Sequence, residues 1–381
     1  MTDCYLPRLG GIERQVHGLA TAQQQLGHDV EIITAVPAGI TGEPDGFRVH
    51  RPRGVDSSRS AITPIRYRGC LAGRRIVGRG DFDVVHVHAS TFSPLGYLTA
   101  SSCAGQVPTA VTLHSLWAYA TPVFAAADSL LGWRRWPVAW SAVSSVAADG
   151  LASVLRGPTV SVLPNGVRAE DWSLPVQTRT ATDRVVIVST MRLAARKRPL
   201  QLLRMLHAVR QQVPASIRIE VDIIGDGPLA PRLREFLHNR QMADWVHLHG
   251  QLPAAEIRRR YADADLYVSP ATLESFGIAA LEARAAGLPV IAFAQTGVAD
   301  FVRDDHEGVL VGSDAEMATA MAALVRSPDR RNRIRLHNSG TTPSQTWPSV
   351  TTLSQELYDR AQALMPSRHR RGQRLLGPVL R

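Results

Sequence analysis

Short apolar runs bounded by turn residues alternate with helix-length amphipathic stretches through both halves of the chain. This alternation is typical of parallel sheets covered by helices, because one parallel strand is reached from the previous one through a crossover, usually a helix. The expected strands are 30–35, 84–88, 109–113, 142–144 and 160–163 in the first half, and 184–189, 217–224, 246–249, 266–269, 290–293 and 308–311 in the second. Each set predicts one Rossmann-like, doubly wound α/β domain.

The length of 381 residues also favours two domains, since a domain typically holds about 150 residues. We expect the first domain at 1–164 and the second at 184–345, facing each other across a cleft. The stretch 165–183 is polar and turn-rich without an apolar period, so it predicts the linker. A last helix is expected within 346–365. The tail at 366–381 carries charge and little apolar surface, so we expect it to be disordered.

The composition excludes several classes of protein. With 45% hydrophobic and 20% charged residues, the chain resembles globular proteins rather than disordered or fibrous ones. No stretch approaches the roughly 20 apolar residues of a membrane span, and the first residues lack the layout of a signal peptide, so we expect a cytoplasmic protein. Cys4, Cys70 and Cys103 lie far apart with no C-x-x-C pair, which supports neither a disulfide framework nor a thiolate zinc site.

The chain is strongly basic and nearly free of lysine. Lysine and arginine total 43 against 33 acidic residues, a net charge of +10, and Lys197 is the sole lysine. Basic residues cluster at 48–79 and 368–381, which favours an anionic partner such as a membrane surface, a nucleic acid or a phosphorylated substrate. The alternative is that these clusters are solvated faces of an arginine-rich protein. A single retained lysine indicates a specific role for Lys197.

The segment 265–291 has the pattern strand, loop, helix, strand. Its helix stops at Gly287, so Glu274 and Ser275 fall in the loop at the carboxyl end of the first strand. Free backbone N–H groups at a helix start attract phosphate. Here those groups belong to Phe276, Gly277 and Ile278.

A second carboxylate, Glu282, follows Glu274 by eight residues. Two carboxylates beside an anion site need donors of their own, and the hydroxyls of a sugar or a ribose are suitable donors. The pattern therefore indicates a nucleotide sugar, and the alternative is a pair of surface acids on a helix.

In this setting, Glu274 to Glu282 resembles the E-x7-E signature of the retaining glycosyltransferases of family 4, which have the GT-B fold. The similarity extends along nearly the whole chain, in the order of the family. It includes a glycine-rich first loop (9–13), a central strand (83–88), an active-site histidine (112–114), an interdomain hinge (163–167), a donor-phosphate loop (189–199) and two later segments (224–228 and 248–250). The resemblance implies that the first domain binds the acceptor and the second binds a nucleotide sugar.

The resemblance also implies roles for individual residues. Glu274 and His114 would be the catalytic residues: Glu274 would contact hydroxyls of the donor sugar near the reacting carbon, and His114 would face the sugar from the first domain. Glu282 would hold the ribose, while Gly10 and Gly11 would leave room for the pyrophosphate. The other residues expected to bind the donor are Arg192, Lys197, Ser275, Phe276, Gly277 and Ile278.

The chemistry of glycosyl transfer agrees with these roles. Departure of a nucleoside diphosphate builds negative charge on the pyrophosphate, which Arg192, Lys197 and the helix N-terminus would neutralise. With these cations, no metal or other cofactor is expected. In the family the anomeric configuration is retained and the leaving phosphate is expected to accept the proton of the acceptor, so no protein nucleophile is assigned. The rival is a hydrolase with Glu274 and Glu282 as acid and base, but such carboxylates face each other across one glycosidic bond.

Four pairs of potential metal ligands have a simpler interpretation. The aspartate pairs precede expected strands as turn or cap residues, and the histidine pairs share a sheet face without a third ligand at matching spacing, so zinc is not expected. The pairs are Asp81 with Asp83, Asp263 with Asp265, His86 with His88, and His247 with His249.

The acceptor is the least constrained part of the prediction. Four tryptophans lie beside Arg134 and Arg135, and with the arginines of 59–79 they predict that the first domain docks on an anionic bilayer, at the inner face of the cell membrane, to reach a lipid acceptor. The alternative is ordinary packing of helices around the cleft. The four are Trp117, Trp133, Trp136 and Trp140.

The donor is expected to be a UDP- or GDP-sugar, with UDP-glucose and GDP-mannose equally favoured. A nucleic-acid partner is not expected, because no nucleic-acid motif accompanies the basic charge. A non-catalytic relative that binds a nucleotide sugar stays as the second interpretation.

Two features depart from the family pattern. Family members usually begin with a short apolar strand, whereas this sequence begins at Met1, Thr2 and Asp3. Either this start is too late, or the first sheet lacks a central strand and holds Gly10 and Gly11 poorly. The stretch 296–300 also departs from the family's Gly-Gly-x-x-Glu turn, so we assign no site residue there.

Overall fold

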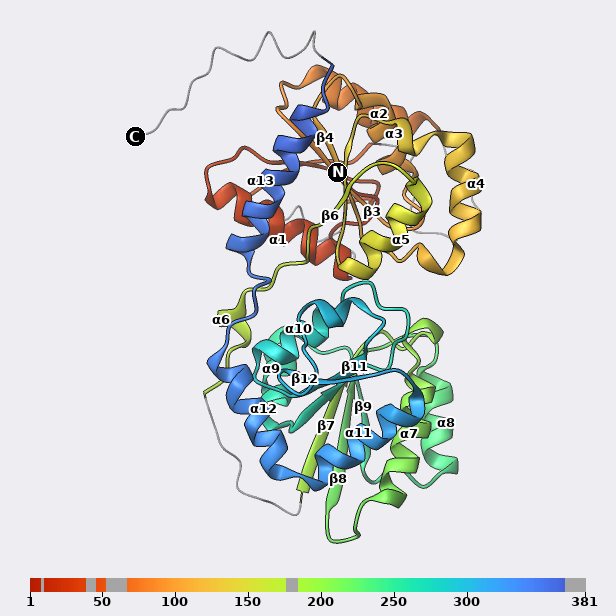
Figure 1. Cartoon of the computed structure of the whole chain (residues 1–381), viewed down its shortest axis with the longest axis vertical. Coiled ribbons are helices and arrows are strands. Elements are labelled where there is room, and N and C mark those ends of the chain that lie inside the picture. Colours follow the sequence, from red (N-terminus) through yellow and green to blue (C-terminus); the bar gives the residue numbers. More distant parts are fainter. Residues whose placement is uncertain (8–9, 39–45, 53–66, 176–183, 367–381) are drawn as a thin grey trace. The chain divides into compact units, whose positions relative to one another are not determined.

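The computed structural model describes residues 1–7, 10–38, 46–52, 67–175 and 184–366, without the side chains of 67–71. The chain divides into two compact units, one of Met1–Gly166 with Trp347–Arg381 and one of Val167–Thr346. The division falls inside the stretch expected to be the linker, and the last helix belongs to the first unit (Figure 1). The expectations for 59–66 and for the tail from 367 onward lie outside the described residues.

The first unit is built on short parallel strands separated by helices, as the alternating pattern predicts. Two of its elements differ from expectation: the strand expected at 142–144 lies three residues earlier, and an additional short strand is present at Arg48–His50. In chain order the elements are α1 (Gly11–Gln25), β1 (Glu31–Ile33), β2 (Arg48–His50), α2 (Tyr67–Arg79), β3 (Val85–Ala89), α3 (Pro94–Cys103), β4 (Thr109–Leu113), η1 (Ala118–Ala120), α4 (Thr121–Leu131), η2 (Trp133–Arg135), β5 (Ala139–Ala142), α5 (Ser145–Leu155), β6 (Val160–Val162) and α13 (Trp347–Ala363).

The strands of the first unit form a parallel four-stranded sheet in the order β3-β4-β5-β6 and a separate parallel pair, β1 with β2. Thr2 stands between the two, because it forms parallel bridges to Thr34, just after β1, and to His88 in β3. Among the described residues, these bridges rather than a named strand occupy the position between β1 and β3.

Helix α13 returns to the first unit by packing on α1. Its first residue, Trp347, lies against Gly18 and Gly166, where an added Cβ would come within 2.2 Å and 2.5 Å of the indole ring. The Gln15 side chain on α1 exchanges hydrogen bonds of 2.9 Å and 2.8 Å with the backbone of Gly166. These contacts hold the start of α1, and therefore the glycine-rich loop before it, against the body of the unit.

The second unit is a single parallel six-stranded sheet in the order β12-β11-β10-β7-β8-β9. Its elements are α6 (Ala169–Trp172), β7 (Arg184–Thr190), η3 (Ala195–Lys197), α7 (Pro199–Gln212), β8 (Arg218–Ile224), α8 (Ala230–Asn239), β9 (Val246–Gly250), α9 (Ala254–Asp263), β10 (Leu266–Val268), α10 (Ile278–Ala285), β11 (Val290–Phe293), η4 (Gly297–Asp300), β12 (Gly308–Val311), α11 (Asp314–Arg326) and α12 (Pro328–Gly340).

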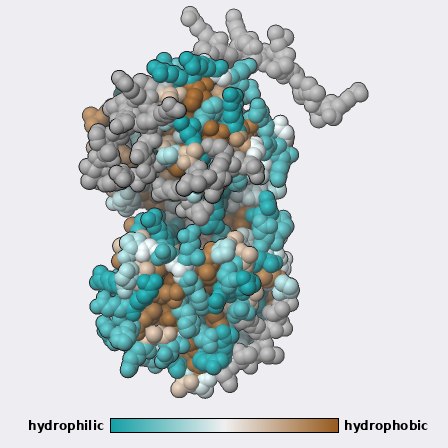
Figure 2. Space-filling view, turned by 180° about the vertical axis from the view of Figure 1, so that it is seen from behind, coloured by the Kyte–Doolittle hydropathy of each residue, from teal (hydrophilic) through white to brown (hydrophobic). Residues whose placement is uncertain are grey.

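The strand order of the second unit places a topological switch point between β7 and β10. The chain moves outward from β7 through β8 to β9, then returns to the centre at β10 and moves outward the other way. Loops at the carboxyl ends of β7 and β10 therefore diverge, and in open α/β sheets such a crevice is where ligands bind. Hydrophilic side chains cover most of the face of this unit that Figure 2 presents, with hydrophobic ones between them.

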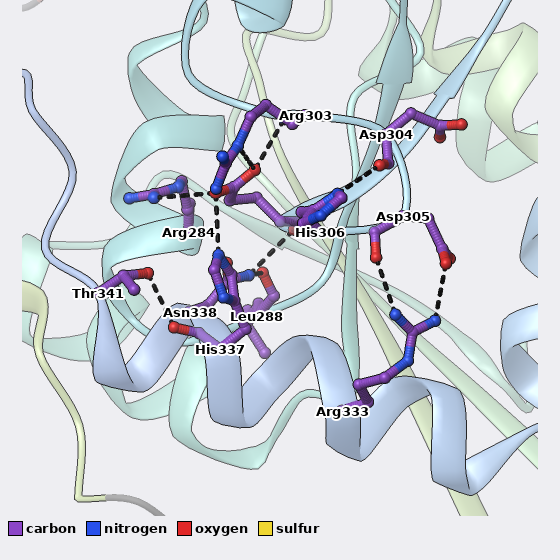
Figure 3. Close-up of polar contacts among 11 residues, drawn as sticks. Arg284, Leu288, Arg303, Asp304, Asp305, His306, Arg333, His337, Asn338 and Thr341 are labelled. Atoms are coloured by element: carbon purple, nitrogen blue, oxygen red, sulfur yellow. Dashed lines mark hydrogen bonds and ion pairs between the residues drawn. The ribbon is translucent and has the colours of Figure 1, made fainter.

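A buried carboxylate ties α10, β12 and α12 together (Figure 3). Glu307 is 2% exposed. Its carboxylate pairs with Arg303 at 2.7 Å, with His337 at 3.0 Å and with Arg284 at 3.5 Å. Burial alone would raise the pKa of Glu307, but the hydrogen bonds from Arg303 and His337 hold it far below its ordinary value. Asn338 completes the cluster by donating to the carbonyls of Leu288 and Glu307. The cluster fixes the carboxyl end of α10, the helix that carries Glu282.

Candidate active site

Lys197 and Glu274 meet at the switch point of the second unit. Lys197 ends η3 on the loop after β7, and Glu274 lies on the loop after β10. The Nζ of Lys197 donates to Oε2 of Glu274, and the side chains are 22% and 11% exposed. The sole lysine and the first glutamate of the E-x7-E pattern thus share one charged site, a contact that the sequence alone did not predict.

The start of α10 lies immediately beside this pair. Its N-cap, Gly277, has φ +94° and ψ 55°, and no side chain caps the helix. An added Cβ on Gly277 would lie 2.7 Å from Val298, so only glycine fits without displacement. Uncapped N–H groups at this end, with no acidic residue in the first turn, form a site suited to a phosphate.

The loop 274–277 is supported by η4, in the stretch to which the sequence assigned no site residue. The N–H of Gly297 donates to the carbonyl of Glu274 at 3.0 Å. A Cβ at Gly297 would lie 2.3 Å from the carbonyl oxygen of Ser275, so the two loops touch backbone to backbone. Phe276 turns its ring into the core against Phe301, which leaves only its backbone for a ligand.

Glu282 lies on α10 and is 7% exposed. Tyr267 of β10 lies in the electrostatic range of both glutamates: burial raises the pKa of its phenol, and the charges of Glu274 and Glu282 raise it further. Its hydroxyl donates to the Thr190 carbonyl at 3.1 Å, at the end of β7. A neutral phenol therefore joins β10 to the end of β7.

The loop with Arg192 is held by two glycines that follow β8. A Cβ at Gly225, which has φ +129°, would lie 1.9 Å from the Met191 carbonyl, and one at Gly227 would lie 2.6 Å from the Leu193 carbonyl. The Arg192 side chain is exposed at this edge. Both expected phosphate cations, Arg192 and Lys197, therefore follow β7 at the carboxyl end of the sheet.

Arg198 is a residue of this region that the sequence analysis missed. Its guanidinium donates to Asp314 at 2.6 Å and to the Pro270 carbonyl at 3.2 Å, and lies over the ring of Phe293. It thereby ties the start of α7 to the loop after β10, to the end of β11 and to the start of α11. The sequence offered one signal for Arg198, its position next to Lys197. The sequence does not show which of two adjacent cations makes structural contacts.

His114 lies in the first unit at the end of β4 and is 9% exposed. Its Nε2 is 3.0 Å from Nδ1 of His88, whose ring lies 4.1 Å from that of His86. His86 in turn contacts Tyr358 at 2.9 Å and Thr112 at 2.7 Å. Burial lowers the pKa of His114 to about 4, so its imidazole is neutral at physiological pH.

Gly10 and Gly11 begin α1 in the first unit. Gly10 is the N-cap, in extended backbone, and a Cβ there would lie 2.3 Å from the Glu13 carboxylate. The site residues therefore divide between the units: Glu274, Glu282, Lys197, Arg192 and Ser275 to Ile278 belong to the second, and His114, Gly10 and Gly11 to the first.

The tryptophans expected at a membrane surface are mostly core residues. Trp117, Trp133 and Trp140 are 0%, 5% and 1% exposed, so for them the interfacial prediction is wrong and the packing alternative holds. They lie in the core of the first unit, where Trp117 packs on Phe124, Trp133 on Tyr97 and Trp140 on Trp136.

Exposed apolar side chains gather instead on and beside α4. The single acid of this helix, Asp128, is 1% exposed and pairs with Arg134. The outer face of the helix therefore carries no acid; Ser129 is exposed on it, and two exposed arginines, Arg134 and Arg135, follow in η2. The exposed members are Tyr119 (58%), Val123 (66%), Leu130 (87%) and Leu131 (57%).

Several members of the pairs of potential metal ligands, including His86 and His88, are engaged in other contacts. Asp265 accepts from the backbone N–H of Val186 at 2.8 Å, and Asp222 accepts from His249 at 2.6 Å. Across the described ranges, no group of three or more His, Cys, Asp or Glu is placed to hold a metal ion. In the same part of the chain, no helix has the length and apolarity needed to cross a membrane.

Comparison with known proteins matches both units to one enzyme class. Residues 9–171 match the model for "Glycosyltransferase Family 4", and residues 170–338 match that for "Glycosyl transferases group 1". A phosphatidylinositol N-acetylglucosaminyltransferase subunit of Arabidopsis thaliana is 25% identical over 95% of this chain and 81% of its own length. The D-inositol 3-phosphate glycosyltransferase of Xylanimonas cellulosilytica is 27% identical over 94% of both chains.

Among solved structures, the Anabaena protein HepE in complex with UDP-glucose has the same fold. It aligns with a TM-score of 0.69 and 16% sequence identity over 94% of this chain and 98% of its own.

Proposed function

Because the chain belongs to the family 4 glycosyltransferases with the GT-B fold, we propose that it moves a hexose from a UDP- or GDP-sugar to a hydroxyl acceptor with retention of configuration. The main support for a donor site is the Lys197–Glu274 pair beside the uncapped start of α10. It places a cation, a carboxylate and free N–H groups at the switch point, where a nucleotide sugar needs all three.

The donor pyrophosphate would bind the N–H groups of Gly277 and Ile278 and the ammonium of Lys197, with Arg192 at the edge. These groups neutralise the charge that grows as the bond between C1 and the phosphate oxygen breaks. They make a divalent cation unnecessary, which is the basis for proposing metal-independent transfer. Glu282 would accept from the ribose hydroxyls, and Glu274 from hydroxyls of the sugar.

For retention, we propose attack from the face that the phosphate leaves. The acceptor oxygen bonds to C1, the bond from C1 to the phosphate oxygen breaks, and the acceptor's proton passes to that phosphate oxygen. Glu274 is already paired with Lys197, which argues against its acting as a covalent nucleophile. His114, as a neutral imidazole, would serve as a hydrogen-bond partner rather than as a cation.

We also propose that the acceptor is membrane-borne and that the α4 surface, formed by Tyr119, Val123, Leu130, Leu131, Arg134 and Arg135, docks on an anionic bilayer. Exposed leucines next to arginines, without an exposed acid on the helix, suit the boundary between lipid tails and anionic headgroups. The name of the Arabidopsis relative, which includes phosphatidylinositol, is consistent with a lipid acceptor.

The test is proton NMR of the full chain with UDP-α-glucose or GDP-α-mannose in EDTA, following the anomeric proton of the released sugar. Initial release of the α-anomer would support retention without metal. Initial release of the β-anomer would overturn retention, and turnover that requires an added divalent cation would overturn metal independence. Donor binding without any turnover, with water or with anionic vesicles that carry phosphatidylinositol, would favour the non-catalytic relative.

A further inference from the structure

One face of the four-stranded sheet in the first unit carries a row of polar side chains. In the parallel register His88 of β3 lies opposite Thr112 of β4, and Thr112 lies opposite Ser141 of β5. His86 precedes His88 by two residues and His114 follows Thr112 by two, so all five side chains project from one face. Helices α1 and α13 pack side by side over this face (Figure 1). The polar groups beneath them must therefore find their hydrogen bonds within the protein.

His86 uses both of its ring nitrogens for such bonds. Gln23 of α1 donates to the Tyr358 hydroxyl at 2.7 Å, so Tyr358 directs its own proton to Nδ1 of His86, 2.9 Å away. Nε2 of His86 then carries the ring proton and donates to Thr112 at 2.7 Å. Thr112 passes its proton to Ser141 at 2.7 Å, and Ser141 donates to a backbone carbonyl of β4 at 3.3 Å. These bonds engage His86 in joining α13 to the sheet.

His88 instead faces His114. Its Nδ1 lies 3.0 Å from Nε2 of His114, and the centres of the two rings are 5.3 Å apart. Burial lowers the pKa of both imidazoles, so both are neutral at physiological pH. A neutral imidazole has one N–H donor and one acceptor nitrogen, so a single proton lies between the two rings. The ring of His86, 4.1 Å away, stacks on His88 and holds it in place.

The backbone of both histidines is already fixed by the sheet. The N–H of His114 donates to the Ala89 carbonyl and that of His88 to the Met1 carbonyl, each at 2.8 Å. What remains to be set is the rotation of the rings, and the terminal torsion of histidine is broad and roughly two-fold. Turning the His114 ring over would exchange its nitrogen-bearing and carbon-bearing edges. The bond to His88 selects one of these two orientations.

We propose that His88 is a positioning residue for His114: it holds Nε2 and thereby fixes which edge of the His114 ring faces the reacting sugar. The inference rests on the proposed function, from which the role of His114 at the sugar comes. His88 acts only through His114, and a small misplacement of a group that contacts the reacting sugar slows the reaction. The pair of His86 and His88, which holds no metal site, thus divides its work between the fold and the reaction.

Three substitutions in the full chain separate these tasks. His88→Phe keeps a ring that stacks on His86 but removes Nδ1, the atom that bonds to His114. His88→Asn is the conservative variant, because its amide places a polar atom close to the position of Nδ1. Tyr358→Phe is the control, since it removes a hydrogen bond to His86 and leaves the contact between His88 and His114 intact.

The first measurement is ¹⁵N NMR of the chain labelled at histidine, with His114→Gln identifying the signals of His114. A ring held in one tautomer gives two well-separated nitrogen shifts, whereas a ring that exchanges tautomers gives averaged ones. We expect separated shifts for His114 in the unmodified chain, in His88→Asn and in Tyr358→Phe, and averaged shifts in His88→Phe. Unchanged shifts in His88→Phe would overturn the proposal. This measurement requires neither donor nor turnover.

The second measurement is hydrolysis of UDP-glucose and of GDP-mannose, followed by release of the sugar, together with Tm. His88→Phe is expected to lower kcat about tenfold or more with little change in the KM for the donor, and His88→Asn to restore most of it. Tyr358→Phe is expected to lower Tm and leave kcat unchanged. A His88→Phe variant with lower Tm but unaltered kcat would overturn the proposal, as would equal losses of kcat in His88→Phe and Tyr358→Phe.

The two measurements also separate this proposal from the function on which it rests. If the unmodified chain hydrolyses neither donor, the proposed function is contradicted. The NMR comparison then still decides whether His88 holds the ring of His114.

Discussion

Lys197 donates a hydrogen bond to Glu274, although 77 residues separate them in the chain. The contact exists because β7 and β10 are neighbours at the centre of the sheet and each is followed by the loop that carries one partner. An incoming phosphate must compete with Glu274 for the ammonium. The pair therefore couples the recognition of the phosphate to the position of the carboxylate assigned to the sugar.

Because of this coupling, we expect Glu274→Gln to strengthen binding of the free nucleotide and to slow sugar transfer. The amide no longer neutralises Lys197, so affinity for free UDP or GDP is expected to rise roughly tenfold, the equivalent of about 1.4 kcal/mol. Sugar transfer is expected to fall, because a hydrogen-bond acceptor for the sugar hydroxyls is lost. Calorimetry with the free nucleotide and a turnover assay measure the two effects, with Glu235→Gln on the exposed face of α8 as control. Weaker binding of the free nucleotide would contradict the competition.

Gly277→Ala tests the close approach at the start of α10. The substitution adds a Cβ 2.7 Å from Val298 and strains a backbone at φ +94°. Gly27→Ala is the matched control, since Gly27 has φ +89° and nothing within 4 Å of an added Cβ. Both variants should lose about 1 kcal/mol of stability from the backbone alone. Only Gly277→Ala should also weaken donor binding, and equal donor affinities of the two variants would contradict a phosphate site at this helix start.

The buried histidines predict loss of stability on acidification. His114 has a folded pKa of about 4 against an ordinary value of 6.5, so the unfolded chain binds a proton in this window that the folded chain does not. Its stabilising effect is complete above about pH 6.5 and is lost toward pH 4, by about 1.4 kcal/mol per pH unit. His86 and His88, whose pKa values burial also lowers, act in the same direction.

Two other groups near these histidines titrate in the same range. Burial lowers the pKa of the Met1 amino group to about 5, which adds to the effect, while it raises the pKa of Asp3 to about 6, which opposes it. The contribution of His114 is therefore measured as a difference. Between pH 7.5 and 5.5, Tm should fall less steeply in His114→Gln than in the unmodified chain, and parallel slopes would contradict the assignment.

The α4 surface predicts binding to anionic vesicles. Leu130→Ser with Leu131→Ser should weaken sedimentation with phosphatidylglycerol-containing vesicles at least tenfold, because burying each leucine contributes about 1.5–3 kcal/mol. Tm should not change, since both side chains are more than half exposed. Leu26→Ser and Leu336→Ser, exposed elsewhere at 64% and 44%, are the controls. Equal losses in controls and test variant would show that α4 is not the docking surface.

The buried carboxylate cluster around Glu307 predicts a stability defect. Glu307→Gln removes the charge that pairs with Arg284, a side chain only 6% exposed, and an uncompensated buried charge costs about 3 kcal/mol. Glu316→Gln, on the exposed start of α11, is the control and should change stability far less. Thermal denaturation separates the two variants, and equal Tm values would contradict the structural importance of the cluster.

Local sequence patterns predicted much of the second unit. The strand, loop and helix around Glu274, Gly277 and Glu282 could be identified because turn residues and a helix stop at Gly287 determine them within 27 residues. The Lys197–Glu274 contact could not, because it depends on which strands are neighbours. Nothing local to either loop encodes that order.

The tryptophans show a different limit. Trp117 and Trp133 belong to a tryptophan-rich stretch that includes Arg134 and Arg135, and such a stretch is equally compatible with a membrane boundary and with a core. Which of the two holds depends on where the helices pack, and here the rings face Phe124 and Tyr97. The exposed apolar residues of α4 were missed because exposure is a tertiary property. A leucine in a helix pattern is most often buried.

The most direct test of the donor site is calorimetric titration of the full chain with UDP-glucose and with GDP-mannose in EDTA. Lys197→Ala and Glu282→Ala are compared with Arg326→Ala, which removes an exposed cation at the far end of α11. The account predicts saturable binding of one donor without metal, weakened at least tenfold by the first two substitutions and unchanged by the third. Equal affinities in all variants would contradict a donor site at Lys197 and Glu282.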